Sequence, residues 1–398
     1  MTPDFLVIGG GIVGINIARE LKRRYSDCSV HLIEKEILST EHSSGRNSGI
    51  LHAGFYYTAD SLKARFTRNG NRLLTDYCLE KNIPINRCGK LVVTQSAADL
   101  PALDVLLQRG KINNVELQEV NEDEAREIEP HVRTFQRALF SPTTSSVDPV
   151  AVVSAIAVDA INEGVVFHYE TGYLKHEKGS VLTNKDKYTP GYVVNAAGLY
   201  ADKVARNYGF SEKYIMLPFK GIYLYSDETT NPIRTHIYPV PDLRNPFLGV
   251  HFTVTVDGKV KIGPTAIPAF WREQYKGLKN FRFSELIEIV SRQIRLLSRS
   301  QFDFRKLAVQ ELRKYYRPHL VNLSKSLATG IDEKHYRRWG RPGIRAQLLN
   351  IENMKLEMDF VLEGDEKSFH VLNAVSPGFT CCIPFAQHVC ERISKILK

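Results

Sequence analysis

The chain has few cysteines, and their spacing suggests neither a metal centre nor a disulfide framework. Six cysteines occur among the 398 residues, and no two of them form a C-x-x-C pair. A density this low is typical of a protein in a reducing, intracellular compartment. The 12 histidines include no H-x-x-x-H or H-E-x-x-H spacing, and no G-x-S-x-G elbow is present. We therefore expect neither a metal site nor a serine hydrolase.

Long apolar runs are missing as well, because no stretch approaches the roughly 18 residues that a membrane-spanning helix needs. We expect no signal peptide, since the first residues lead directly into an apolar strand. A cytoplasmic location is expected, with peripheral association with the inner membrane left open. The net charge of +9 suits an anionic membrane surface or acidic small substrates. The basic residues are scattered, without zinc-finger or RNA-binding signatures, so nucleic acid is not expected as a partner.

What the chain does contain is a glycine-rich turn near its start. Phe5 to Ile8 is a short apolar run, typical of a buried parallel strand. Gly9, Gly11 and Gly14 follow it with G-x-G-x-x-G spacing. In dinucleotide-binding folds the first glycine permits a tight turn. The second lets the pyrophosphate approach the backbone, and the third lets the helix pack on the strand.

The residues after the glycines complete a βαβ unit. The apolar positions of 12–25 fall on one helical face, and Val30 to Ile33 is predicted to be a second strand. Glu34 ends that strand, 20 residues after Gly14, where an acidic residue binds ribose hydroxyls. An acid at this position disfavours the 2′-phosphate of NADP, whereas the motif alone leaves NAD and FAD open.

The remainder of the chain indicates a second, different subdomain. Residues 39–57 form a polar loop with three glycines, suited to wrapping around a ligand. Between Pro218 and Gly263 several segments alternate in character, which predicts an antiparallel sheet. Strands are predicted at 90–94, 192–198, 220–225, 235–238, 248–256, 260–262, 360–362 and 369–372, and helices at 61–81, 149–162, 283–327 and 384–397.

Several motifs give the chain a family resemblance over nearly its whole length. Their residues are the Gly9–Gly14 turn, the loop from Ser44 to Gly54, Tyr56-Tyr57, Asn195 to Asp202, Pro218 to Gly221, Gly343 to Gln347, and Asn373 to Pro377. By these motifs the chain resembles the FAD-dependent D-amino-acid-oxidase-like superfamily. More narrowly, it resembles the L-2-hydroxyglutarate oxidases and dehydrogenases.

The resemblance implies an α/β fold with two domains. The first is a Rossmann-like FAD-binding domain of the D-amino-acid-oxidase (GR2) type, and the second is an α+β substrate domain built on an antiparallel sheet. The FAD domain is expected to comprise 1–85, 147–215 and 340–398, and the substrate domain 86–146 and 216–339.

The resemblance also implies which residues contact FAD. Backbone N–H groups before the last helix, together with the dipole of that helix, would stabilise the anionic reduced flavin. The predicted cofactor-binding residues are Gly9, Gly11, Ile12, Val13, Gly14, Glu34, Lys35, Ser44, Asn47, Ser48, Gly49, Val166, Ala197, Gly198, Gly378, Phe379 and Thr380.

Oxidation of a 2-hydroxy acid by a flavin needs a cation for the carboxylate and a base for the hydroxyl proton. Arg345 is the predicted catalytic residue that binds the carboxylate, because a guanidinium pairs with a carboxylate bidentately. His52 and His251 are the two candidates for the base, and His251 is also a candidate carboxylate contact. Lys220 is the candidate cation for a distal carboxylate, and Tyr57 is predicted to bind substrate.

The function implied by the resemblance is oxidation of L-2-hydroxyglutarate to 2-oxoglutarate, with hydride transfer from C2 to flavin N5. One alternative keeps the flavin and changes the substrate to another 2-hydroxy acid, an amino acid such as glycine or a D-amino acid, or glycerol 3-phosphate. A second alternative is a basic nucleic-acid- or membrane-binding protein that retains only a nucleotide fold. Oxygen, a membrane quinone and a soluble carrier all remain open as electron acceptors.

Overall fold

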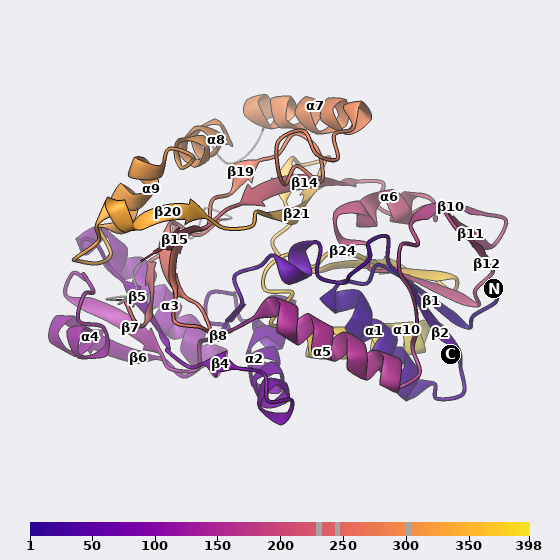
Figure 1. Ribbon diagram of the computed structural model, residues 1–398, viewed down its shortest axis with the longest axis horizontal. Coiled ribbons are helices and arrows are strands. Elements are labelled where there is room, and N and C mark those ends of the chain that lie inside the picture. Colours follow the sequence, from indigo (N-terminus) through magenta and orange to yellow (C-terminus); the bar gives the residue numbers. More distant parts are fainter. Residues whose placement is uncertain (228–232, 243–246, 300–303) are drawn as a thin grey trace. The chain divides into compact units, whose positions relative to one another are not determined.

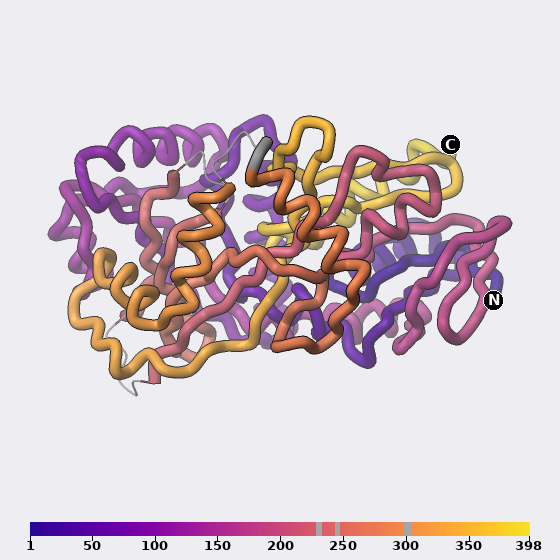
Figure 2. The backbone as a smooth tube through the Cα atoms, turned by 90° about the horizontal axis from the view of Figure 1, so that it is seen from above, coloured from indigo at the N-terminus to yellow at the C-terminus, as the bar shows by residue number. Residues whose placement is uncertain are grey.

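A computed structural model of the chain describes residues 1–227, 233–242, 247–299 and 304–398 (Figures 1 and 2). The chain divides into two compact units. Unit 1 contains 1–47, 149–218 and 345–398, and unit 2 contains 48–148 and 219–344. Segment 48–85, expected in the FAD domain, therefore clusters with unit 2. The domain limits given above concern function, and they stay a prediction.

Unit 1 is built around a six-stranded sheet with the order β23-β24-β13-β1-β2-β9. Neighbouring strands are parallel, except that β23 and β24 form an antiparallel hairpin. This largely parallel sheet is the one expected for a Rossmann-like domain. The strands are β1 (Phe5–Ile8), β2 (Val30–Ile33), β9 (Val166–His168), β13 (Tyr192–Asn195), β23 (Val361–Gly364) and β24 (Ser368–Asn373).

Helices from distant parts of the sequence meet in unit 1. Helix α1 (Ile12–Arg24) packs against both α5 (Pro149–Asn162) and α10 (Cys382–Ile396), so the indigo and yellow ends of the chain lie together in Figure 1. Leu6 and Ile8 of β1 share a core cluster with Val181 and Tyr188, which come from a three-stranded sheet. That sheet consists of β10 (Tyr173–Glu177), β11 (Ser180–Thr183) and β12 (Lys187–Tyr188), and α6 (Ala201–Arg206) also contributes to the cluster.

Unit 2 is built around an eight-stranded sheet with the order β20-β15-β18-β17-β16-β5-β7-β6. Its strands pair antiparallel except for β16 and β5, which are parallel. The strands are β5 (Lys90–Val93), β6 (Gln118–Asn121), β7 (Arg137–Ser141), β15 (Leu224–Ser226), β16 (His236–Pro239), β17 (His251–Val254), β18 (Val260–Gly263) and β20 (Tyr336–Trp339).

One face of this sheet is apolar and forms the main core of unit 2. Neighbouring strands place buried residues side by side on it, namely Leu91, Ile237, Phe252 and Ile262. Residues of α4 (Glu122–Ile128) and α9 (Arg317–Ser324) belong to the same cluster, so these helices cover the face. Because side chains alternate along a strand, the residues between the core positions lie on the opposite face.

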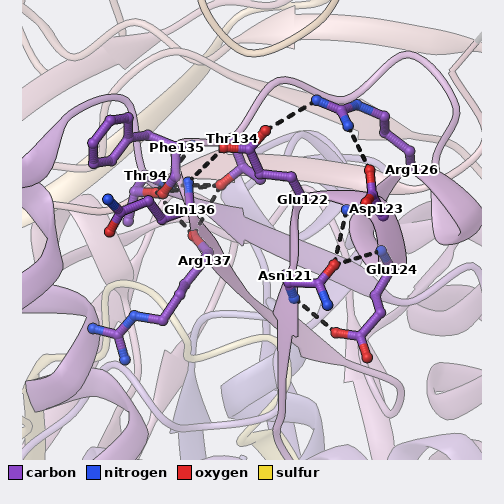
Figure 3. Close-up of polar contacts among 10 residues, drawn as sticks. All are labelled: Thr94, Asn121, Glu122, Asp123, Glu124, Arg126, Thr134, Phe135, Gln136 and Arg137. Carbon is purple, nitrogen blue, oxygen red and sulfur yellow. Dashed lines mark hydrogen bonds and ion pairs between the residues drawn. The ribbon is translucent and has the colours of Figure 1, made fainter.

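Helix α4 is held at the sheet edge by polar contacts that its own sequence supplies (Figure 3). The Asn121 side chain accepts hydrogen bonds from the backbone N–H groups of Asp123 and Glu124 at 2.9 and 3.0 Å. The Glu124 carboxylate accepts the Asn121 N–H at 2.7 Å in return, which completes a capping box. The Glu122 carboxylate accepts the Gln136 N–H at 2.8 Å, which ties the helix to the residues before β7.

The chain passes between the units four times, at 47/48, at 148/149 and within the two strands β14 (Tyr214–Gly221) and β21 (Gly343–Asn350). None of the described helices is long and apolar enough to cross a membrane. The remaining named elements are β3 (Ile50–Leu51), β4 (Ile85–Asn86), β8 (Ser145–Val147), β19 (Ile267–Pro268), β22 (Lys355–Leu356), α2 (Leu62–Glu80), α3 (Leu100–Ile112), α7 (Phe283–Arg299) and α8 (Phe304–Arg313), with short 3-10 turns such as η1 (Ser43–Gly45).

One strand prediction was wrong in detail. The predicted strand 220–225 is two strands, because β14 ends at Gly221 and β15 starts at Leu224 in another sheet. The backbone N–H and C=O of Ile222 bond to Thr265 instead of continuing either ladder. The strands β15 to β18 of the region 218–263 pair with one another antiparallel, as predicted, and β16 also pairs in parallel with β5 from outside that region. Residues 300–303 of the predicted helical region 283–327 lie outside the described residues.

Candidate active site

The glycine turn after β1 has the geometry that a dinucleotide needs. Gly9 has a φ of +106°, and a Cβ on it would lie 2.5 Å from the carbonyl oxygen of Ala196. A Cβ on Gly14 would lie 1.9 Å from the carbonyl oxygen of Gly9. No side chain fits at either position, so the two glycines let α1 begin directly at the edge of the sheet.

The N-terminus of α1 is prepared for a phosphate. Gly11 is the N-cap residue, and the first turn, with Ile12 and Val13, contains no acidic residue. The Ser44 hydroxyl accepts the Ile12 N–H at 2.9 Å. A Cβ on Gly11 would lie 3.0 Å from that hydroxyl. The positive end of the helix dipole and its N–H groups are thus kept uncrowded by a bare backbone.

Glu34 is fixed beside this turn at the end of β2. One carboxylate oxygen accepts the Gly10 N–H at 2.7 Å, and the other accepts the Glu36 N–H at 2.9 Å. Each carboxylate oxygen can accept a further bond, so ribose hydroxyls could still be bound. Lys35 pairs with Glu36 at 3.0 Å and lies 5.3 Å over the ring of Tyr200. These features fit the adenosine diphosphate half of FAD.

The end of β13 lies at the same edge of the sheet. The Asn195 side chain accepts the Ala197 N–H at 3.1 Å and donates to the Ala201 carbonyl at 2.8 Å, which fixes the small-residue turn. Gly198 has a φ of +54°, and no atom lies within 4 Å of the position of a Cβ there. The predicted pair Ala197 and Gly198 therefore borders open space next to Gly9.

The turn before α10 is also closely built. A Cβ on Gly378 would lie 2.1 Å from the carbonyl oxygen of Ala374, so the backbone folds back on itself there. Thr380 is buried and Phe379 is half-buried. The first turn of α10 has no acidic residue, and the side chain of its N-cap residue Cys381 does not cap the helix. This helix end suits the predicted stabilisation of a negative charge.

The predicted loop residues divide between the units. In unit 1, the Asn47 side chain donates to the Ser44 carbonyl at 2.7 Å, which holds the loop around η1. In unit 2, Gly49 has a φ of +76° and accepts the Val147 N–H at 2.8 Å. The Ser48 carbonyl accepts a bond from Lys261 Nζ at 3.1 Å.

The positions of two predicted residues of unit 1, Val166 and Arg345, do not by themselves indicate a role. Val166 begins β9 opposite His31, two residues before the strand end at which the His168 carbonyl accepts the Glu34 N–H. The sequence analysis missed Thr171, which contacts Glu34 directly. The Thr171 N–H donates to the Glu34 carbonyl at 2.7 Å. Arg345 lies half-buried in β21 and begins the last segment of unit 1.

In unit 2 the predicted base His251 lies on the polar face of the eight-stranded sheet. Register places Lys90 opposite His236, and Thr253 opposite Lys261, on the face that lacks the apolar core. Alternation along the strands adds Tyr238 and His251 to this face. The polar face thus carries Lys90, Tyr225, His236, Tyr238, His251, Thr253 and Lys261, all buried except the half-buried Tyr225.

His251 is buried and held in one tautomer. Its Nδ1 donates to the Gly249 carbonyl at 2.8 Å, and its ring stacks on Tyr238 with the centroids 3.7 Å apart. In the neutral imidazole the lone pair is then on Nε2, which can accept a proton. His251 therefore does not face solvent.

His52 follows β3 and has a strongly depressed pKa. Burial lowers the pKa of His52 to about 3, and the charge of Lys90 contributes to the shift. The imidazole is therefore neutral throughout the physiological range. It is unprotonated and ready to accept a proton, yet it is a weak base.

Lys90 and Lys261 are the residues that sequence reasoning missed. Lys90 is fully buried, its Nζ has no hydrogen-bond partner, and burial lowers its pKa to about 7. Lys261 is buried with its Nζ 4.6 Å from the Tyr223 ring centroid, and burial lowers its pKa to about 8. The sequence feature that could have indicated them is a single lysine in each of two otherwise apolar strands.

The other two predicted substrate residues also belong to unit 2. Lys220 is half-buried in β14, its Nζ lies 6.0 Å from the Tyr315 ring centroid, and burial lowers its pKa. Tyr57 lies in the segment after β3, and its carbonyl accepts a bond from the Asn113 side chain at 3.0 Å. Lys63 lies 6.0 Å from the Tyr57 ring centroid.

Comparisons with known proteins agree with this geometry. The model of the FAD dependent oxidoreductase (DAO) family matches residues 4–392. The L-2-hydroxyglutarate dehydrogenase of Escherichia coli strain K12 is 33% identical, with 99% of this chain and 94% of that protein covered. The mitochondrial L-2-hydroxyglutarate dehydrogenase of Homo sapiens is 34% identical, with 98% and 89% covered.

Solved structures show the same fold at lower identity. The FAD-bound L-alpha-glycerophosphate oxidase of Mycoplasma pneumoniae superposes with a TM-score of 0.77 at 20% identity, covering 99% of this chain and 95% of that one. The glycine oxidase of Geobacillus kaustophilus gives a TM-score of 0.72 at 16% identity, covering 100% and 96%. The chain therefore belongs to the FAD dependent oxidoreductase family, in one group with the L-2-hydroxyglutarate dehydrogenases, and FAD is its cofactor.

Proposed function

We propose that this protein oxidises L-2-hydroxyglutarate to 2-oxoglutarate. The relatives with this activity in their names align over nearly the whole chain. The structural observation that carries the proposal is the polar face of unit 2, where two buried lysines lie on the same face as His251. Buried positive charge of this kind suits a substrate with two carboxylates.

The residues of the chain have separate tasks in this proposal. Bound FAD would supply the acceptor of the C2 hydride. Arg345 pairs with the carboxylate beside C2 and so orients the C2–H bond. The hydroxyl proton passes to His251 Nε2 or to His52, and the fixed tautomer of His251 favours the former.

We assign the FAD-binding domain to 1–85, 147–215 and 340–398, and the substrate domain to 86–146 and 216–339. The glycine turn, Glu34 and the turn before α10 all belong to the first set. The polar face of the unit 2 sheet belongs to the second, because all strands of that sheet lie within 86–146 and 216–339. The assignment predicts that substrate-domain variants such as His251→Asn retain FAD.

Peripheral association with an anionic membrane surface is part of the proposal, with a membrane quinone as the electron acceptor. Helix α7 exposes an apolar stripe, because Phe283, Ile287 and Ile294 are 66%, 55% and 59% exposed. The exposed Arg282 and Arg295 border the stripe. Apolar side chains flanked by arginines are typical of helices that lie in the surface of an anionic bilayer. A second copy would oppose like charges across the same stripe.

Two measurements test the proposal. Anaerobic mixing of the yellow protein with L-2-hydroxyglutarate should bleach the flavin, whereas D-2-hydroxyglutarate, glycine and glycerol 3-phosphate should not. If one of the other compounds bleaches the flavin instead, that compound is the substrate.

The second measurement is sedimentation with vesicles. Sedimentation with phosphatidylserine vesicles should exceed that with phosphatidylcholine vesicles and should be lost in Ile287→Glu/Ile294→Glu. The membrane role would be contradicted if the variant sedimented with phosphatidylserine vesicles as strongly as the wild type. It would also be contradicted if the wild type dimerised through this stripe in the absence of vesicles.

A further inference from the structure

In the described part of unit 2, two residues in contact with each other each have a buried polar atom without a hydrogen-bond partner. Lys90 Nζ is one of them, and the hydroxyl of Tyr56 is the other. The aromatic rings of Phe55, Tyr56 and Tyr238 surround the ammonium, with centroids 4.7–4.8 Å from Nζ. Such ring contacts stabilise an ammonium by less than the cost of burying it unpaired. Both atoms are hydrogen-bond donors, so the missing partner is an acceptor.

No negative charge among the described residues offsets Lys90. The titratable groups that face it are His52 and Tyr56 from the segment after β3, His236 and Tyr238 from β16, and Cys88 just before β5. Burial raises the pKa of Cys88 to about 12 and raises the pKa values of both tyrosines, so all three are neutral. The two histidines have lowered pKa values and are neutral as well.

The two ring nitrogens of the neighbouring His236 are both engaged elsewhere and offer Lys90 no acceptor. His236 Nδ1 accepts the Val254 N–H at 3.0 Å, and its Nε2 is directed to Cys88 Sγ at 3.3 Å. Lys90 itself is anchored by the pairing of β5 with β16 and β7, so its stem cannot move away without breaking the sheet. Burial lowers the pKa of Lys90, and no carboxylate of the described residues opposes that shift.

We propose that Lys90 and the Tyr56 hydroxyl bind the distal carboxylate of the substrate, and that Lys90 takes up a proton from solvent when the dicarboxylate binds. The inference rests on the proposed function, because it requires a substrate with a second carboxylate. Lys90 is favoured over Lys220 for this role because it shares the polar face with His251. An ammonium and a phenol together supply the donors that a carboxylate accepts.

The proton uptake follows from linkage between binding and ionisation. With a pKa of about 7, Lys90 is mostly neutral at pH 8 and mostly protonated at pH 6. A bound carboxylate favours the ammonium and raises this pKa. Binding at pH 8 should therefore draw close to one proton from the buffer, and binding at pH 6 should draw almost none.

Calorimetry with the oxidised holoenzyme measures this uptake directly. Glutarate is the probe, because it carries both carboxylates and has no hydroxyl to oxidise. Titrations in two buffers of different ionisation enthalpy, at pH 6 and pH 8, give the protons taken up per glutarate. We expect Lys90→Met to abolish the uptake at pH 8 and to weaken binding about 10- to 100-fold, the loss of a charge-assisted hydrogen bond.

Matched variants separate this role from a structural one. Lys111→Met removes an exposed lysine and should retain both affinity and uptake. Tyr56→Phe should weaken binding but retain the uptake. All variants should carry wild-type amounts of FAD. Suppose that L-2-hydroxyglutarate reduces the flavin but the wild type takes up no proton on binding glutarate, or Lys90→Met takes up as many protons as the wild type. Either result overturns this inference and leaves the proposed function intact. A wild type that neither binds glutarate nor is reduced by L-2-hydroxyglutarate overturns the proposed function as well.

Discussion

Lys90 and His236 stand directly opposite each other on the only parallel pair of strands described in the unit 2 sheet. Each group is positive when protonated, and the charge of Lys90 contributes to lowering the pKa of His236. Two such groups side by side, with no carboxylate between them, destabilise the protein at low pH and create a strong preference for an anion.

The first prediction is that Lys90→Met stabilises the protein. The ordinary pKa of lysine is 10.5 and the pKa of buried Lys90 is about 7, so the unfolded chain binds a proton there between these values and the folded chain does not. Wild-type stability is therefore penalised fully below pH 7, and the penalty disappears as the pH rises to 10.5. The variant should gain a few kcal/mol at pH 6, at about 1.4 kcal/mol for each pKa unit, and little at pH 10.

Chemical denaturation of the holoenzyme at pH 6, 8 and 10 gives this difference. Lys111→Met is the control, and its stability should stay within about 0.5 kcal/mol of the wild type at every pH. A variant at Lys90 that is less stable than the wild type at pH 6 would show that the ammonium is already neutralised.

The second prediction concerns the glycine turn. Gly11→Val should fold but lose FAD, because the side chain would fill the place of the pyrophosphate near Ser44. Gly172→Ala is the matched control, since a Cβ there would meet Lys35 Cβ only at an ordinary 3.6 Å. The flavin-to-protein absorbance ratio after desalting measures the FAD content of both variants, and it should fall only in Gly11→Val. Full flavin content in Gly11→Val would mean that the phosphates bind elsewhere.

The third prediction concerns Arg345. Arg345→Ala should lose about 2–5 kcal/mol of transition-state stabilisation in kcat/KM, the range for truncating a buried charge pair. Arg345→Lys should recover only part of this loss, because an ammonium cannot form the bidentate fork. Both proteins should remain yellow. Loss of FAD together with activity would place Arg345 on the cofactor, and unchanged kcat/KM would make it a bystander.

The fourth prediction separates the two histidines. His251→Asn should slow flavin reduction about 10²–10⁴-fold if its Nε2 takes the hydroxyl proton. His52 is neutral above a pKa of about 3, so it cannot cause a rate change near neutral pH. If His52 is the base, His52→Asn should lower the rate by a constant factor between pH 5 and 9. Stopped-flow reduction of both variants across this range identifies the base, and wild-type rates in both would exclude both.

The nucleotide edge could be predicted because it is local in sequence. Gly9, Gly14 and Glu34 lie within one βαβ unit, and each needs only its neighbours to take up its role. The position of Val166 relative to Glu34 could not be predicted in this way, since it depends on where β9 ends and not on spacing.

The polar face could not be predicted in this way. Its composition depends on the register between β5 and three strands that begin some 150 residues later, and a shift by one residue would turn Lys90 into the apolar core. In the sequence, a lysine before Leu91 resembles any strand residue at an exposed edge. Its burial becomes visible only once the parallel pairing with β16 is known.

The packing of α1 against α10 has a consequence for synthesis. Helix α1 is translated long before α10, its packing partner. At the usual 5–20 residues per second, the surface of α1 that α10 covers waits roughly 20–70 s for α10. Strand β24 is translated shortly before α10, so the nucleotide-binding sheet is also completed long after its first strand has been made. The nascent chain therefore exposes apolar surface during this interval, which makes it a substrate for a chaperone.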